Sequence, residues 1–321
     1  MSVRGPVTET HEAPPERPGA LAAIGRTPVV RLSKLQGPDS ADVWVKLEGA
    51  NPTGSYKDRM ALAMIEGAER RGALTPGQTV VEYTGGSTGS SLAFVCAIKG
   101  YPLKIVSSNA FAEEKIATMR AFGADVELIH SDEGIHPRLI PQMMERVAEI
   151  VEHEGAFPTD QFNNLDVLDG YLGIGRELVE QIDGPIDGLA VYVGVGGAFT
   201  GTWRPIRERW PGVVRTVVEP AESAVISGEP AGSHRIEGGG VGFVPPLITA
   251  DSYDRVAQVS TGEAFECARR LARSEGVWTG PSGGASVLAA MRLAADLGPG
   301  HTVVTLQPDS GLKYLSGDLY R

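Results

Sequence analysis

Cysteine is scarce in this chain: Cys96 and Cys267 are the only two among 321 residues. Each lies in an apolar run of helical pattern, so we expect free, buried thiols in a reducing compartment and no disulfide. The six histidines are scattered, and no spacing of cysteines, histidines and carboxylates predicts a metal site. The sequence also lacks a signal-peptide core and any run of about 18 apolar residues, which favours a cytoplasmic protein outside the membrane.

Basic residues are outnumbered as well. The chain has 29 lysines and arginines against 40 acidic residues, giving a net charge of -11 and a pI of about 5.1. Such a protein is a poor binder of nucleic acid or anionic membranes, so any phosphate must be held by a local pocket. The remaining composition, 42% hydrophobic and 21% charged, is ordinary for a globular protein, and the length suits two domains.

The pattern that is present alternates short β-branched runs with helical stretches, which predicts parallel α/β sheets with ligands at the carboxyl ends of strands. Residues 1–18, rich in Pro, Glu and Thr, are expected to be a disordered lead. Ser260 and Glu263 have the spacing of a helix capping box. Strands are expected at 29–32, 42–48, 79–83, 103–107, 124–129, 188–193, 213–220 and 303–311, and helices at 59–71, 92–100, 112–122, 139–154, 175–182 and 261–275 and from 202 and 281.

The stretch NPTGSYKDR, residues 51–59, leads from a predicted strand through a turn into a helix. It places Lys57 at the helix start, where the partial positive charge of the helix end eases loss of the ammonium proton. A neutral lysine amine is the nucleophile that forms a Schiff base with pyridoxal phosphate (PLP). Most lysines near a helix start are solvated surface charges, so this interpretation depends on the rest of the chain.

Two further polar turns follow predicted strands. GVGGAFTG, residues 194–201, precedes a helix and suits a phosphate, because glycines let backbone N–H groups approach an anion closely. Its spacing does not match the GxGxxG fingerprint of dinucleotide binding. TGGSTGSS, residues 84–91, offers amides and hydroxyls that suit a carboxylate. Taken singly, the first stretch is often just a tight turn, and a Ser/Thr-capped turn is the favoured interpretation of the second.

Together these stretches resemble the cysteine synthase family of fold-type II PLP enzymes, which typically reads NPTGSVKDR, GTGGTxTG and TSGNTG at these places. The resemblance extends from IGRTPVVRL to QPDSGLKYLS and includes a glycine-rich loop at 238–242 at the active-site mouth. It implies a tryptophan synthase β-like fold of two α/β domains, each a mostly parallel sheet flanked by helices. The smaller domain is expected at 45–160 and the larger at 19–44 plus 161–321, in a homodimer with PLP as cofactor.

The resemblance also implies roles for single residues. Lys57 carries PLP and acts as general base. Ser310, rather than the adjacent Asp309, bonds the pyridine nitrogen, and a neutral hydroxyl there favours β-chemistry over transamination. The other cofactor contacts are expected from Ser87, Gly194, Val195, Gly196, Gly197, Ala198 and Thr200.

Several of these positions depart from the family. Val195 and Ala198 replace two phosphate-facing threonines, a loss that Thr200 or ordered water would have to offset. Ser87 replaces an asparagine that bonds the cofactor's ring oxygen, and Gly85 replaces a serine. The substrate carboxylate is expected to be held by Thr84, Gly85, Gly86, Ser87, Thr88 and Gln161.

The resemblance predicts an enzyme that acts through an aminoacrylate at the β-carbon of a β-substituted L-alanine, namely O-acetylserine, phosphoserine or cysteine. Replacement by sulfide or another small nucleophile is placed slightly ahead of elimination to pyruvate, ammonia and sulfide. The altered loops favour a specialised relative. Two other classes stay open at this point, a non-catalytic relative that holds PLP and a nucleotide-binding α/β protein.

Overall fold

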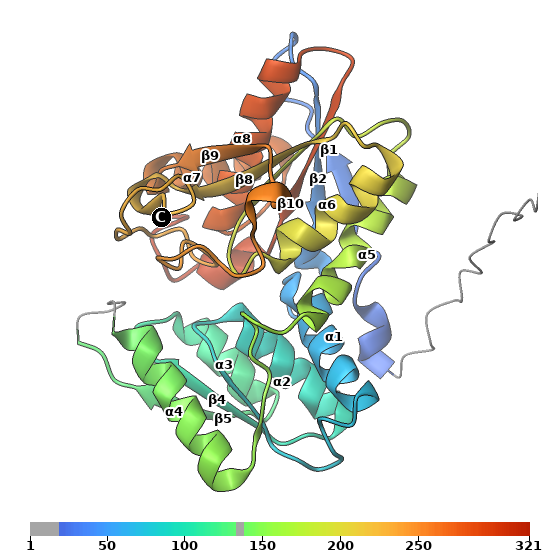
Figure 1. The fold of residues 1–321 in the computed structure, drawn as a ribbon. Coiled ribbons are helices and arrows are strands. Elements are labelled where there is room, and N and C mark those ends of the chain that lie inside the picture. The colour runs from blue at the N-terminus through green and yellow to red at the C-terminus, as the bar shows by residue number, and fades with distance from the viewer. Residues whose placement is uncertain (1–18, 133–137) are drawn as a thin grey trace, which may run out of the picture.

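The computed structural model describes residues 19–132 and 138–321, so the predicted lead at 1–18 lies outside the described residues. The described chain forms a six-stranded sheet, β1-β2-β10-β7-β8-β9, and a four-stranded sheet, β5-β4-β3-β6. In both, the paired strands are parallel, except that β1 runs antiparallel to β2. Figure 1 shows the larger sheet above the smaller one, with helices packed around both. The predicted α/β fold class is confirmed.

The six-stranded sheet forms the larger core. Its central strand β7 is buried at every position, which is typical of a parallel strand with both faces covered. The strands are β1 (Val29–Arg31), β2 (Asp42–Leu47), β7 (Gly188–Tyr192), β8 (Val214–Pro220), β9 (Arg255–Val259) and β10 (Thr302–Gln307). The accompanying helices are α5 (Asp166–Gln181), α6 (Gly197–Arg209), α7 (Thr261–Arg270), a π-helical turn (Leu271–Glu275) and α8 (Pro281–Leu297).

The four-stranded sheet is built from the middle of the N-terminal half. Helix α1 (Lys57–Arg70) leads into it and packs against both α2 and α5, so it lies where the two units meet (Figure 1). The strands are β3 (Val80–Tyr83), β4 (Leu103–Ser108), β5 (Asp125–Ile129) and β6 (Phe157–Pro158), with α2 (Ser87–Lys99), α3 (Glu113–Ala121) and α4 (Leu139–Glu154). Short 3-10 helices span Gly19–Ala23, Glu48–Ala50, Ala221–Ser223, Ala250–Ser252 and Gly311–Tyr314.

The main differences from the predicted elements concern glycine. Helices α2, α5 and α6 each begin several residues earlier than expected, inside glycine-containing stretches. Glycine lowers helix propensity, but here it lets α5 and α6 approach closely: a Cβ at Gly201 would lie 2.6 Å from Cβ of Tyr171. Strands β6 and β9 were not predicted, because one has two residues and the other lies at a sheet edge. The capping box at Ser260 and Glu263 is confirmed.

The predicted domain boundary at 44/45 falls within β2, which pairs with β10 along its whole length. A division drawn along the sheets would therefore keep 19–47 with the larger unit, and the two-domain assignment stays a prediction. Cys96 and Cys267 are buried, and neither forms a disulfide. Within 19–132 and 138–321, no helix combines the length and apolar character needed to cross a bilayer.

Candidate active site

Lys57 is the first residue of α1, as the sequence predicts. The turn before it is fastened to the end of β10 by two backbone hydrogen bonds. Ser310 N donates to Gly54 O at 2.9 Å, and Tyr56 N donates to Pro308 O at 2.9 Å. The lysine turn and the expected pyridine partner are therefore held side by side, although they lie near opposite ends of the chain.

The Lys57 side chain is buried, with 7% of its surface exposed. Burial lowers the pKa of its amine to about 8, against the opposing effect of the Asp309 and Glu82 carboxylates. The sequence argument assigned this shift to the helix end, whereas loss of hydration is the main cause in the structure. The consequence is the expected one: near neutral pH a larger fraction of the amine is neutral, and therefore nucleophilic, than in an exposed lysine.

The glycine-rich turn after β7 opens onto the same pocket as Lys57. Gly196 has φ +91° and precedes α6, and no side chain of the described residues caps this helix start. Its first N–H groups are thus available to an anion, which the helix end also favours. The pocket is lined by Tyr56, Lys57, Tyr192, Val193, Gly194, Val195, Gly196, Ala198 and Phe199. The Lys57 amine and the backbone N–H groups that suit an anion therefore face the same pocket.

The side chains of this turn add no hydroxyl donor to the pocket. Val195 and Ala198 line it with apolar groups, as their sequence predicts. The hydroxyl of Thr200 donates to Leu247 O at 3.1 Å, so its hydrogen is already committed. The expected compensation by Thr200 is therefore not favoured by this geometry, and backbone N–H groups are the donors that the turn offers.

The polar turn after β3 is joined by a distant glutamine, as predicted. The Thr88 hydroxyl donates to Gln161 Oε1 at 2.9 Å, and Gln161 Nε2 donates to Tyr83 O at 3.3 Å. Thr84 Oγ1 accepts from Gly86 N at 3.1 Å, which fixes the turn before α2 begins at Ser87. The structure thus gathers the residues expected to hold a substrate carboxylate around one helix start.

Gly85 is explained by a residue that sequence reasoning missed. A Cβ at this position would overlap the ring of Phe111, which comes from the segment before α3. The ring occupies the space that the family's serine side chain would need. Nothing in the local sequence pairs the two positions, although the departure at Gly85 marks where a compensating change was to be sought.

Ser310 and Asp309 point to different tasks. Ser310 Oγ accepts from Leu312 N at 3.3 Å, which leaves its own hydrogen free to be donated. The Asp309 carboxylate is buried, accepts from the Tyr314 hydroxyl at 2.6 Å, and has its other oxygen directed at Gly280. Burial raises the pKa of Asp309. The geometry therefore agrees with Ser310 as the hydroxyl donor beside the lysine turn.

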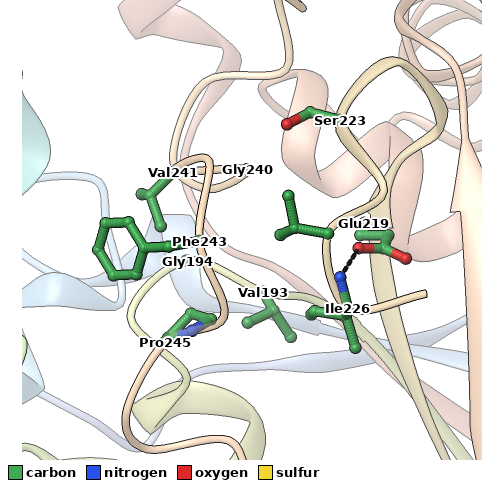
Figure 2. A pocket seen from close by; sticks show the side chains of 10 residues that line it. Val193, Gly194, Glu219, Ser223, Ile226, Gly240, Val241, Phe243 and Pro245 are labelled. Atoms are coloured by element: carbon green, nitrogen blue, oxygen red, sulfur yellow. Dashed lines mark hydrogen bonds between the residues drawn. The ribbon is translucent and has the colours of Figure 1, made fainter. Parts of the chain in front are cut away.

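A second pocket lies beside the 194–201 turn, where the glycine-rich loop at 238–242 packs against it. Figure 2 shows Val241 of that loop and the adjacent Phe243 on one side and Val193 and Ile226 on the other. Glu219 borders the space, but its carboxylate accepts from Ile226 N at 2.7 Å, so it fixes the neighbouring turn. We read this pocket as packing space behind the loop.

The comparisons with known proteins agree with this geometry. The family model described as pyridoxal-phosphate dependent enzyme matches residues 20–309. The chain is 40% identical over 299 residues to a cysteine synthase of Staphylococcus aureus, covering 92% of this chain and 95% of that protein.

Solved structures are similar over nearly the whole chain. O-acetyl serine sulfhydrylase isoform 3 of Entamoeba histolytica has a TM-score of 0.88 at 33% identity, covering 100% of this chain and 94% of that one. A hydrogen sulfide-producing enzyme of Fusobacterium nucleatum has a TM-score of 0.86 at 33% identity, covering 94% and 100%. The predicted relationship and PLP dependence are confirmed, and the chain belongs to the family of pyridoxal-phosphate dependent enzymes.

Proposed function

We propose that this enzyme replaces the β-substituent of O-acetyl-L-serine with sulfide, as a cysteine synthase does. The observation that carries the proposal is that Lys57 shares a pocket with the glycine-rich turn at 194–201. A buried amine of lowered pKa fits the aldehyde of PLP, and the uncapped start of α6 fits its phosphate. The similarity to a cysteine synthase and to an O-acetyl serine sulfhydrylase supports the choice of reaction.

The proposed roles of the residues follow from their positions. Bound PLP supplies the electron sink that stabilises negative charge at the substrate Cα. Lys57 Nζ would hold the cofactor and would serve as the general base for the Cα proton of the substrate. The N–H groups of the 194–198 turn hold the phosphate, and the Ser310 hydroxyl donates to the ring nitrogen. That neutral donor limits the electron sink and favours chemistry at the β-carbon.

The substrate would be oriented by the other helix start. Thr88, Gln161 and the N–H groups of 85–88 surround the place where the carboxylate is expected. The Thr88–Gln161 hydrogen bond is buried, so it holds these two side chains in fixed positions at this side of the site. Ser87 is too short to take over every contact of an asparagine, and we propose that it leaves the cofactor's ring oxygen less tightly bound.

The test is an absorbance titration of the purified, PLP-loaded protein with O-acetyl-L-serine, first without and then with sulfide. We expect the visible band to shift on adding the amino acid and to return when sulfide is added, with cysteine as the product. Release of pyruvate without sulfide would instead favour elimination, which the likeness to the hydrogen sulfide-producing enzyme keeps as the second candidate. An unchanged spectrum would contradict the proposed use of O-acetyl-L-serine.

We also propose that the protein works as a homodimer in the cytoplasm. The first part rests on the resemblance to cysteine synthases, and the second on two buried thiols that form no disulfide. The mass in solution, measured by light scattering on the purified protein, tests the dimer: twice the 33.9 kDa of one chain is expected.

A further inference from the structure

An ion pair beside the 84–91 turn, the turn expected to hold the substrate carboxylate, joins the unit of the four-stranded sheet to the unit of the six-stranded sheet. Lys115 lies in the first turn of α3, and its side chain is only 5% exposed. Its ammonium bonds the carboxylate of Glu237, which precedes the glycine-rich mouth loop and belongs to the larger unit. The ammonium also lies 4.9 Å from the centre of the Tyr314 ring. The cation is thus held by two groups, a carboxylate and an aromatic ring.

The stem of Lys115 lies directly on the turn expected to hold the substrate. A Cβ added to Gly86 would lie 2.5 Å from Lys115 Cδ and 3.3 Å from Nζ. Gly86 is the residue before α2, whose free N–H groups form the expected carboxylate site. A substrate bound there has Lys115 and Glu237 close to it, and the ring of Phe111 covers the neighbouring Gly85.

The charges around this place cancel. Glu237 neutralises Lys115, and the buried Asp309 carboxyl interacts electrostatically with two cations, Lys115 and Lys313. A partly buried charge acts strongly over a few ångströms, because the effective dielectric constant there is well below that of water. Because the carboxylate and the β-carbon are bonded to the same Cα, the β-substituent of a substrate held at this turn lies within a few ångströms of the pair. A doubly charged phosphate there would meet a neutral pair and an aromatic ring, whereas an acetyl group or a thiol has no charge to compensate.

We propose that Glu237 is a specificity-determining residue, which neutralises Lys115 and so restricts the enzyme to donors with an uncharged β-substituent. This inference rests on the proposed function and deepens it by naming the class of donor. The enzyme would accept acyl esters of L-serine or the thiol L-cysteine, and it would not accept phosphate monoesters of L-serine.

The experiment compares O-acetyl-L-serine with O-phospho-L-serine by absorbance titration of the PLP-loaded protein, which reports binding without turnover. The wild type should bind the acetyl ester more tightly. Glu237→Gln frees the Lys115 charge and should improve the apparent Kd for O-phospho-L-serine about tenfold relative to O-acetyl-L-serine. Glu229→Gln, an exposed carboxyl in the same segment, removes the same charge away from the site and should leave the ratio unchanged.

A double variant isolates the mechanism. Adding Lys115→Met to Glu237→Gln should abolish the gain, because the freed cation is then absent. An unchanged ratio in Glu237→Gln, equal binding of both donors by the wild type, or loss of the O-acetyl-L-serine response in Glu237→Gln would overturn the inference. A wild type that responds to no donor would contradict the proposed function itself, so the two failures are distinguishable.

Discussion

The starts of α6 and α2 look alike in sequence and differ in what surrounds them. Each follows a buried strand and a glycine-rich turn, and neither has a side-chain cap within the described residues. At α6 the first glycine of the turn packs against other backbone, because a Cβ at Gly194 would overlap Gly238 O, while Gly196 and Gly197 face the apolar side chains of Ile248 and Val167. At α2 the turn packs against side chains, namely Phe111 and Lys115.

This difference suits two functions, binding of the cofactor at one helix start and binding of the substrate at the other. The contact at Gly194 can vary little, because a backbone carbonyl cannot be exchanged for something smaller, and this suits a cofactor that never changes. A site walled by side chains can be remodelled one residue at a time, and it suits a substrate that differs between relatives. The departures at Gly85 and Ser87 lie in the second kind of site, which is where we expect this enzyme to differ from a standard cysteine synthase.

The largest expected effect distinguishes two buried lysines, one at each site. Lys57→Ala should abolish the visible absorbance of the bound cofactor and lower turnover by more than about a thousandfold, because both the linkage and the base are lost. Lys115→Ala should keep that absorbance, because this lysine lies at the substrate turn. Absorbance spectra and assays of both variants check the pair, and retained activity in Lys57→Ala would sink the mechanism.

The next largest effect concerns the backbone contact of the turn before α6. Gly194→Ala should weaken PLP binding by about tenfold or more, because the new methyl group meets the Gly238 carbonyl and forces the backbone of the turn aside. Gly212→Ala, where a Cβ would meet no atom within 4 Å, is the matched control and should bind PLP normally. Equilibrium titration of the cofactor-free proteins measures both. Normal binding by Gly194→Ala would show that the turn has more freedom than the structure indicates.

The turn before α2 should behave differently, since the neighbour of Gly85 there is a side chain. Gly85→Ser alone should raise the apparent Kd for O-acetyl-L-serine, because the new side chain meets the Phe111 ring. With Phe111→Ala in the same protein the space is restored, and we expect a coupling of about 0.5–3 kcal/mol in the double-mutant cycle. Additive effects of the two substitutions would remove the contrast between the two helix starts.

A smaller effect should appear in the pH dependence of cofactor capture. Because burial lowers the pKa of Lys57 to about 8, the neutral amine is populated at lower pH than in an exposed lysine. The rate at which cofactor-free protein binds PLP covalently should therefore rise through about pH 8 and level off above it. Stopped-flow absorbance from pH 6 to 10 measures the profile. A rate that still climbs near pH 10 would show an ordinary, hydrated amine.

The sequence was sufficient for features that are contiguous in the chain. Lys57 and the turns at 84–91 and 194–201 each combine a strand end, glycine and a helix start, so local patterns and the family resemblance located them. Phe111, Lys115 and Glu237 were missed because they act on these turns from other elements, and no local pattern records such contacts. The pKa of Lys57 was anticipated in direction, but its main cause is burial, which the sequence does not display.

The most direct test of the account is to fix the cofactor in place and find where it is. Reducing the PLP-loaded protein with borohydride, followed by peptide mass spectrometry, identifies the lysine that carries PLP. We predict the added mass on the peptide containing Lys57, the buried amine that shares a pocket with the 194–198 turn. The mass on a peptide containing Lys46, Lys115 or Lys313 instead would contradict the assignment of this pocket as the active site.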